Sequence, residues 1–102
     1  MMPLIEAHIT KIAELCRRYH VERLELFGSA ARGADFDPQR SDIDLLVTYQ
    51  PQAQPTFNDY FDLSEQLAAL FARPVDLVMS GAVRNPYLRA GIERSKELLY
   101  AA

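Results

Sequence analysis

The sequence predicts an α/β (α+β) fold, in which a small mixed β-sheet is flanked by helices within a single domain spanning residues 1–102. Three observations support this prediction. Short apolar runs of strand length alternate along the chain with segments of helical spacing, a pattern typical of layered α/β sandwiches. A length of 102 residues suffices for one hydrophobic core but not for two. The hydrophobic share of 49% and the charged share of 25% are those of an ordinary globular domain.

The net charge and the cysteine count narrow the class of function. A net charge of -3 lacks the basic footprint of a nucleic-acid-binding surface, so no direct contact with nucleic acid is expected. Cys16 is the only cysteine, which excludes an intramolecular disulfide and fits a reducing cytosol. No apolar stretch is long enough to cross a membrane, and no basic segment precedes an apolar run at the N-terminus. We therefore expect a cytoplasmic protein that makes no membrane contact.

The N-terminal segment predicts one amphipathic helix from Leu4 to Tyr19. Its apolar positions follow helical spacing: Ile5, Ile9, Ile12 and Cys16. Cys16 is expected to be a small core residue rather than a nucleophile, because no activating motif surrounds it. His8 and His20 lack the spacing of metal ligands and are expected at a helix surface and a helix end.

The next segment, Val21 to Phe27, predicts a strand with Leu24 and Leu26 on one face, and this strand leads into a glycine turn. Gly28 permits backbone conformations closed to other residues and lets a ligand approach closely. Ser29 can cap the short helix that follows, and the free N–H groups at a helix start bind anions such as phosphate. Taken alone, Gly28-Ser29 is more simply interpreted as an ordinary turn with a serine cap. The carboxylates that follow in the sequence favour a phosphate site instead.

Two carboxylates lie on the second predicted strand, from Ser41 to Tyr49. Because strand side chains alternate, Asp42 and Asp44 point the same way, and the intervening apolar residues point into the core. Two acids on one face disfavour each other's charge. A divalent cation would compensate, and Mg²⁺ is typically held by a few carboxylates plus substrate phosphates. The alternative is the solvent face of an edge strand, but the continuous apolar run after the acids favours a buried strand that begins where the sheet opens.

The rest of the chain completes the layered pattern. After a loop over residues 50–55, Thr56 is placed to cap a helix from Phe57 to about Ala72. The apolar side of this helix is expected in the core rather than as a base-stacking platform: Phe57, Phe61, Leu67, Leu70 and Phe71. Arg73-Pro74 ends the helix.

A third strand, Val75–Met79, carries one acid, Asp76, in an otherwise apolar run. Asp76 is either a strand-end acid facing water or a third member of the carboxylate group. After a turn at Ser80-Gly81, Asn85-Pro86 predicts the start of a helix that runs to Arg94. A short final strand is expected over residues 97–100.

Two stretches together resemble the signature of the minimal nucleotidyltransferases (MNT), a branch of the DNA polymerase beta-type nucleotidyltransferase superfamily. They are Phe27-Gly28-Ser29-Ala30-Ala31-Arg32-Gly33 and Ser41-Asp42-Ile43-Asp44-Leu45. The similarity extends from Val21 to about Tyr100, and the combination is specific although each part alone is common. The branch includes prokaryotic antitoxins paired with HEPN-domain toxins. One departure is a slightly longer loop between Arg32 and Ser41, which contains Asp35, Phe36, Asp37 and Pro38.

The resemblance implies a polymerase beta-like fold and an enzyme that transfers AMP from ATP to a hydroxyl with the help of two Mg²⁺ ions. It assigns the catalytic and metal-binding roles to Asp42, Asp44 and Asp76, the last of which would orient or deprotonate the acceptor. Gly28 and Ser29 would hold the terminal phosphates of ATP. Arg32 either contacts a phosphate or neutralises acids of the following loop.

The resemblance also implies a partner. Larger relatives grip the acceptor with a second domain, for which this chain has no residues to spare, so we expect the acceptor to dock from outside. It would be a tyrosine of a cognate HEPN-type toxin, a ribonuclease that the chain silences as its antitoxin, with a hetero-oligomer as the expected assembly. One alternative is a non-catalytic binding module that neutralises a partner protein by occlusion, and a third hypothesis is a metal-free scaffold domain. The sequence does not identify the base, so ATP as the donor rests on the resemblance.

Overall fold

The computed structural model describes residues 3–32 and 42–102. Within them a four-stranded sheet has the order β3-β2-β1-β4. The strands are β1 (Val21–Phe27), β2 (Ile43–Tyr49), β3 (Val75–Met79) and β4 (Glu97–Ala101). Strand β1 is antiparallel to both β2 and β4, whereas β2 and β3 run parallel. The predicted mixed sheet is confirmed.

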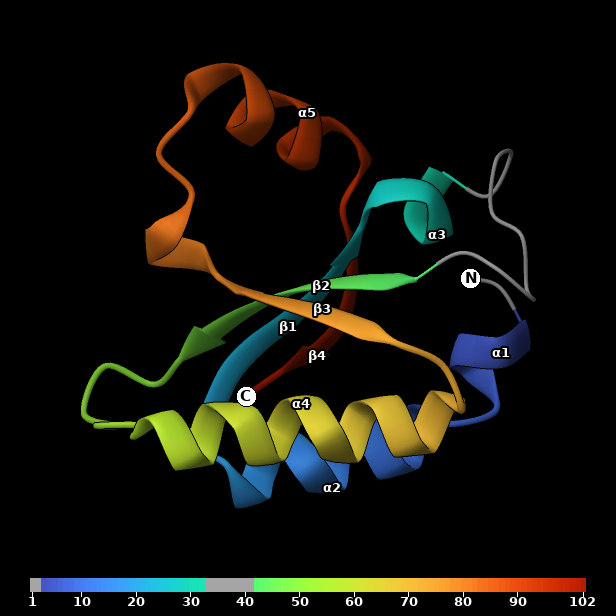
Figure 1. The fold of residues 1–102 in the computed structure, drawn as a ribbon, viewed down its shortest axis with the longest axis vertical. Helices are drawn as coiled ribbons and strands as arrows, with labels where there is room; N and C mark the ends of the chain where they lie inside the picture. Colours follow the sequence, from blue (N-terminus) through green and yellow to red (C-terminus); the bar gives the residue numbers. More distant parts are fainter. Residues whose placement is uncertain (1–2, 33–41) are drawn as a thin grey trace.

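Helices lie on both faces of this sheet (Figure 1). On one face, the α2/α4 face, α2 (Ile9–Arg18) and α4 (Phe57–Phe71) run side by side beneath the strands. On the opposite face, the α3/α5 face, α3 (Gly28–Arg32) and α5 (Pro86–Ser95) contact each other. The main core fills the space between the sheet and the α2/α4 pair, and its fully buried residues include Ile12, Cys16, Leu24, Leu26, Ile43, Leu45, Leu63 and Leu67.

The single N-terminal helix expected from Leu4 to Tyr19 is wrong. The structure has α1 (Pro3–Glu6) and then α2, with a break at Ala7 and His8, where His8 has a non-helical φ of -115° and ψ of 10°. The His8 ring lies edge-on to Phe71 at the end of α4, with 5.9 Å between ring centroids. The break keeps Ile5 fully buried but leaves Ile9, a member of the predicted stripe, 37% exposed.

Helix α4 has the predicted bounds and cap but not the predicted core side. Thr56 Oγ1 accepts from the Asp59 N–H, and the Asp59 carboxylate accepts from the Thr56 N–H, which forms a capping box. Phe57 and Phe61, however, are 83% and 58% exposed. At about 100° per residue, these two rings lie about 80° and 120° from the middle of the stripe that meets the sheet, which contains Leu63, Leu67 and Phe71.

The C-terminal elements agree with the prediction to within one or two residues. A 3₁₀ turn, η1 (Ser80–Ala82), follows β3. Asn85 caps α5 by accepting from the backbone N–H groups of Tyr87 and Leu88. Strand β4 then pairs with β1 at the far edge of the sheet. None of the helices in residues 3–32 and 42–102 combines the length and the apolar character that crossing a bilayer requires.

Candidate active site

The α3/α5 face of the sheet carries three rows of side chains, because residues two apart on a strand share a face. In the first row the strand register places Phe27 beside Asp44 and Asp44 beside Asp76. In the second row Leu46 lies between Glu25 and Val78. The third row is polar: Arg23 pairs with Thr48 in the register, and the Thr48 hydroxyl donates to Ser80 Oγ over 3.1 Å. The first row, called the acidic row because it contains Asp44 and Asp76, therefore lies where β1 ends and β2 and β3 begin.

Gly28 and Asp44 are in direct van der Waals contact at this edge. Gly28 follows β1 and adopts a φ of +70°, a conformation that other residues rarely take. A Cβ built on Gly28 would overlap Oδ2 of Asp44 and lie 3.1 Å from its Cγ. The glycine is therefore required both by the backbone turn and by the carboxylate packed against it.

The three predicted carboxylates are only partly brought together. Asp44 is half-buried in β2 and has the exposed Asp76 of β3 as its register neighbour. Asp42 is exposed and immediately precedes β2, two positions from Asp44. In the part of the chain that the structure describes, no three Asp, Glu, His or Cys side chains are gathered closely enough to hold a metal ion. These carboxylates therefore do not form a complete protein-only cage for an ion.

The donor set nevertheless suits Mg²⁺ in its chemistry. This ion typically takes one or two carboxylates and fills its remaining positions with water and substrate phosphates, rather than occupying an all-protein cage. Asp44 and Asp76 lie side by side on adjacent strands, which hold neighbouring backbones about 4.8 Å apart. The arrangement matches a site that is completed by its substrate.

The remaining predicted site residues lie in or next to α3. The predicted cap is wrong, because α3 already begins at Gly28 and Ser29 lies inside its first turn. Ser29 is half-buried and one residue from the Gly28–Asp44 contact. Arg32 ends α3, but its side chain, like the whole of the predicted loop at 33–41, lies outside the described residues.

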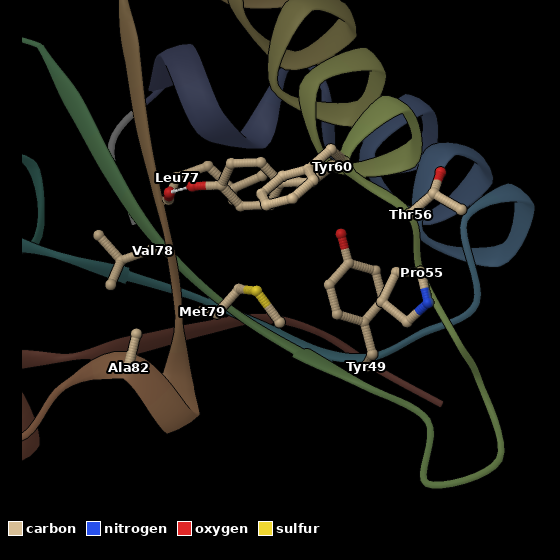
Figure 2. Close-up of a pocket in the computed structure, with 9 residues that line it drawn as sticks. Tyr49, Pro55, Thr56, Tyr60, Leu77, Val78, Met79 and Ala82 are labelled. Atoms are coloured by element: carbon tan, nitrogen blue, oxygen red, sulfur yellow. Dashed lines mark hydrogen bonds between the residues drawn. The ribbon is translucent and has the colours of Figure 1, made fainter.

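A groove of about 660 Å³ opens on the α2/α4 face, between the start of α4 and the end of β3 (Figure 2). The Tyr60 hydroxyl donates to the backbone carbonyl of Leu77 on the edge strand. The Tyr49 hydroxyl is buried in the same groove and has no hydrogen-bond partner within residues 3–32 and 42–102. Burial, and then the nearby Tyr60 and Asp59, raise the pKa of Tyr49 to about 12. Sequence reasoning missed this groove because Phe57, which lines it, was assigned to the core.

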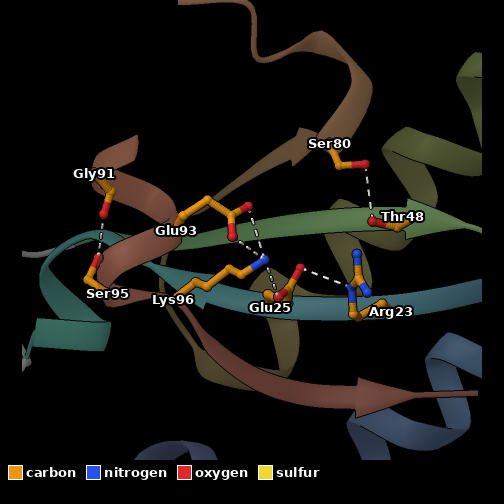
Figure 3. A network of polar contacts seen from close by, with 8 residues as sticks. All are labelled: Arg23, Glu25, Thr48, Ser80, Gly91, Glu93, Ser95 and Lys96. Carbon is orange, nitrogen blue, oxygen red and sulfur yellow. Dashed lines mark hydrogen bonds and ion pairs between the residues drawn. The ribbon is translucent and has the colours of Figure 1, made fainter. Parts of the chain in front are cut away.

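An ion-pair network joins β1 to the end of α5 on the α3/α5 face (Figure 3). Glu25 is only 5% exposed, and its carboxylate lies 3.0 Å from Lys96 Nζ and 3.2 Å from Arg23 Nε. Lys96 Nζ also lies 3.0 Å from Glu93, and the hydrogen bonds to Glu93 and Glu25 raise the pKa of Lys96. The network fixes the end of α5 beside the second row, next to the acidic one.

Comparison with known proteins places these features in a family. The sequence model of the family described as "Polymerase beta, Nucleotidyltransferase" matches residues 10–102. A Methanocaldococcus jannaschii protein named "Putative protein adenylyltransferase" is 36% identical over 83 residues, which cover 81% of this chain and 79% of the relative. The protein adenylyltransferase MntA of Thermococcus cleftensis is 34% identical over 89 residues, which cover 85% of this chain and 81% of MntA.

Solved structures agree with the family. One described as "Structure of putative minimal nucleotidyltransferase" is 32% identical and superposes with a TM-score of 0.74, covering 94% of this chain and 95% of the other. A second, the MNT antitoxin complex with a tri-AMPylated Shewanella oneidensis HEPN toxin, has a TM-score of 0.67. Its 21% identity, over 96% of this chain and 73% of the other, shows the fold alone. The chain belongs to the polymerase beta nucleotidyltransferase family and has the fold of its minimal members.

Proposed function

We propose that this chain is an antitoxin that transfers AMP from ATP to a tyrosine hydroxyl of a cognate HEPN-type toxin, in a Mg²⁺-dependent reaction. Family membership supports nucleotidyl transfer. Two relatives that are more than 30% identical are named as protein adenylyltransferases, one of them provisionally. The fold is shared with an MNT antitoxin whose HEPN toxin partner carries AMP. These likenesses favour a protein acceptor over a small molecule.

The observation that carries the proposal is the contact of Asp44 with Gly28 together with the register of Asp44 with Asp76. A nucleotidyl transfer needs phosphates held beside carboxylates. Here a glycine turn at the end of β1 meets the acids of β2 and β3 at one edge of the sheet. A scaffold domain has no need of two carboxylates that are register neighbours and disfavour each other's charge.

The resemblance implies a role for each residue, and the place of each residue in the structure is compatible with that role. Gly28 exposes backbone that a phosphate can approach, and Ser29 beside it offers a hydroxyl. Asp42, Asp44 and Asp76 would bind the two Mg²⁺ ions. Asp76, which is exposed at the start of β3, would orient the acceptor hydroxyl and take its proton. Bound Mg²⁺ supplies charge neutralisation and polarisation at the transferred phosphate.

The second candidate is a module that neutralises its partner by binding alone. The exposed rings of Phe57 and Phe61 favour it, because such a surface fits a protein partner whether or not transfer occurs. The two functions differ in whether inhibition of the partner requires the carboxylates.

A transfer assay tests the proposal. The chain is incubated with Mg²⁺, α-labelled ATP and the HEPN-type product of the adjacent gene, beside an Asp42→Asn/Asp44→Asn variant. We expect label on a tyrosine of the partner with wild type only, and the other three NTPs to give less label than ATP. If the partner is inhibited equally by both proteins and carries no label, transfer is refuted and the binding module stands. An equal signal with all four NTPs refutes ATP as the preferred donor.

A further inference from the structure

The groove on the α2/α4 face is apolar and open at the surface. Its walls come from the ends of β2 and β3, from η1 and from the start of α4, and they consist of Tyr49, Pro55, Thr56, Phe57, Tyr60, Leu77, Val78, Met79 and Ala82. Its volume of about 660 Å³ lies in the range of ligand and anchor pockets, about 300–1,000 Å³. None of these described lining residues is charged, so the groove is shaped for an apolar group.

Three large apolar side chains remain exposed at this groove and beside it. Phe57 and Met79 line it with exposures of 83% and 42%. Phe61, 58% exposed, stacks on Phe57 with 6.4 Å between ring centroids and meets the Tyr60 ring edge-on at 5.7 Å. Aromatic and methionine side chains that surround a pocket are typical of protein interfaces.

A buried polar atom, the Tyr49 hydroxyl, lies at the groove. The Tyr49 hydroxyl points toward the Tyr60 ring and has no partner among the described residues (Figure 2). Tyr60, by contrast, uses its hydroxyl on Leu77. A buried hydroxyl without a partner costs about 1–3 kcal/mol, so an occupant that accepts a hydrogen bond from Tyr49 recovers this cost.

The acidic residues of α4 favour a basic partner at the groove. Helix α4 contains Asp59, Asp62 and Glu65 but no lysine or arginine. Asp62 accepts from Tyr19 at the end of α2, beside Arg18, whereas Glu65 is exposed one helical turn from Phe61. The charge of Asp59 reaches the groove, since it helps to raise the pKa of Tyr49. A second copy of this chain docked around a two-fold axis at α4 would bring like charges together, which is unfavourable. A partner with basic residues beside its apolar anchor has the complementary charge.

We propose that this groove docks a basic, amphipathic segment of the partner protein, with an apolar side chain between Tyr49 and Met79 and a lysine or arginine facing the acids of α4. The identification of that partner as the HEPN-type toxin rests on the proposed function. Strand β3 connects the two surfaces, because Leu77 and Met79 face the groove while Asp76 faces the acidic row. Docking here holds the partner beside the strand that carries Asp76 and raises the local concentration of the acceptor.

The test measures binding and transfer separately, with the HEPN-type product of the adjacent gene as the probe. Phe57→Ser/Phe61→Ser removes the exposed rings, which carry little of the fold because they are mostly solvated. Tyr87→Ser/Leu88→Ser is the matched control, since these side chains are 87% and 56% exposed on α5, away from the groove. Thermal melts confirm that both variants fold. Calorimetry gives Kd, and α-labelled ATP reports transfer.

We expect the phenylalanine variant to weaken Kd at least tenfold and the α5 control to change it less than twofold. Glu65→Gln, an exposed site one helical turn from Phe61, should weaken binding less and reduce its dependence on salt. Wild-type affinity in the phenylalanine variant overturns the docking site while leaving transfer intact. If wild type binds the partner but transfers no label, the proposed reaction is overturned and the docking site is not. If wild type shows neither binding nor transfer, both proposals are overturned. Wild-type self-association that is lost in the phenylalanine variant assigns the groove to a second copy and overturns the proposal.

Discussion

Gly28 and Asp44 are packed so closely that a Cβ on Gly28 would overlap the Oδ2 atom of Asp44 and lie 3.3 Å from its Cβ. The turn that ends β1 and the carboxylate that begins β2 therefore determine each other's position. This contact explains why glycine and aspartate occur together at the edge of the sheet where the acids gather.

Gly28→Ala should disrupt both the fold and the site. The residue has a φ of +70°, where an alanine costs about 1–2 kcal/mol, and the new methyl group must displace Asp44. We expect lower stability in urea unfolding and a loss of transfer of about a hundredfold, since displacements near 1 Å can have that effect. Gly91→Ala is the control: nothing lies within 4 Å of its Cβ position in α5. It should gain about 0.5–1 kcal/mol. Full transfer by Gly28→Ala would contradict the role of this contact.

Nucleotide and Mg²⁺ together should stabilise the wild type through Asp44 and Asp76. A ligand at about a hundred times its Kd adds about 2.7 kcal/mol to the free energy of unfolding, which appears as a higher Tm. We expect AMP-PNP with Mg²⁺ to raise Tm for wild type and for Glu65→Gln, an exposed residue on the opposite face. Neither Asp44→Asn nor Asp76→Asn should respond. An equal rise in all four proteins would place the nucleotide elsewhere.

The acidic row could be predicted because it depends on local rules. Alternation along β2 placed Asp44 opposite the buried residues, which include Ile43 and Leu45 at 0% exposure. The parallel pairing of β3 with β2 then placed Asp76 beside Asp44. The exact approach of Asp44 to Gly28 depends on how the strands twist, which no sequence pattern specifies.

The groove and the ion-pair network could not be predicted, because each joins residues from distant segments. Phe57 and Phe61 fit a helical stripe as well as Leu63 and Leu67 do, and only the position of the sheet decides which pair is buried. Glu25 lies between Leu24 and Leu26 in the sequence, and strand alternation alone does not say that it is buried. It is buried because Lys96, at the far end of the chain, pairs with it.

Two tyrosines in the groove should differ in how the loss of their hydroxyls changes the free energy of unfolding. Tyr60→Phe removes the donor to the Leu77 carbonyl on the edge strand and should cost about 0.5–1.5 kcal/mol. Tyr49→Phe removes a buried hydroxyl that has no partner in the part of the chain that the structure describes, and it should leave stability unchanged or raise it. Urea unfolding of both variants beside wild type measures the contrast. A Tyr49→Phe variant less stable than Tyr60→Phe would show that the Tyr49 hydroxyl has a partner in solution.

Lys96 should stabilise the fold far more than a lysine on the surface. Lys96→Met leaves the buried Glu25 carboxylate with Arg23 as its partner among the described residues, at a cost of about 1–3 kcal/mol. Lys11→Met breaks a pair with Glu14 in which both side chains are more than half exposed, at 69% and 53%. Such a pair contributes about 0–1 kcal/mol. Chemical denaturation at neutral pH should show this difference.

The stability that Lys96 contributes should decrease at high pH. Hydrogen bonds to Glu93 and Glu25 raise the pKa of Lys96 above its ordinary value of 10.5. The folded state thus holds this proton more tightly than the unfolded chain does, so the contribution is complete below pH 10.5 and is lost as pH rises above it. The raised pKa of Tyr49, about 12, also lowers the free energy of unfolding over a similar pH range, but it does so equally in wild type and Lys96→Met. The stability gap between wild type and Lys96→Met should therefore stay constant from about pH 7 to pH 9 and shrink above pH 10.5. A gap that persists undiminished to pH 12 would mean that Lys96 stabilises the fold by packing its stem, not by its charge.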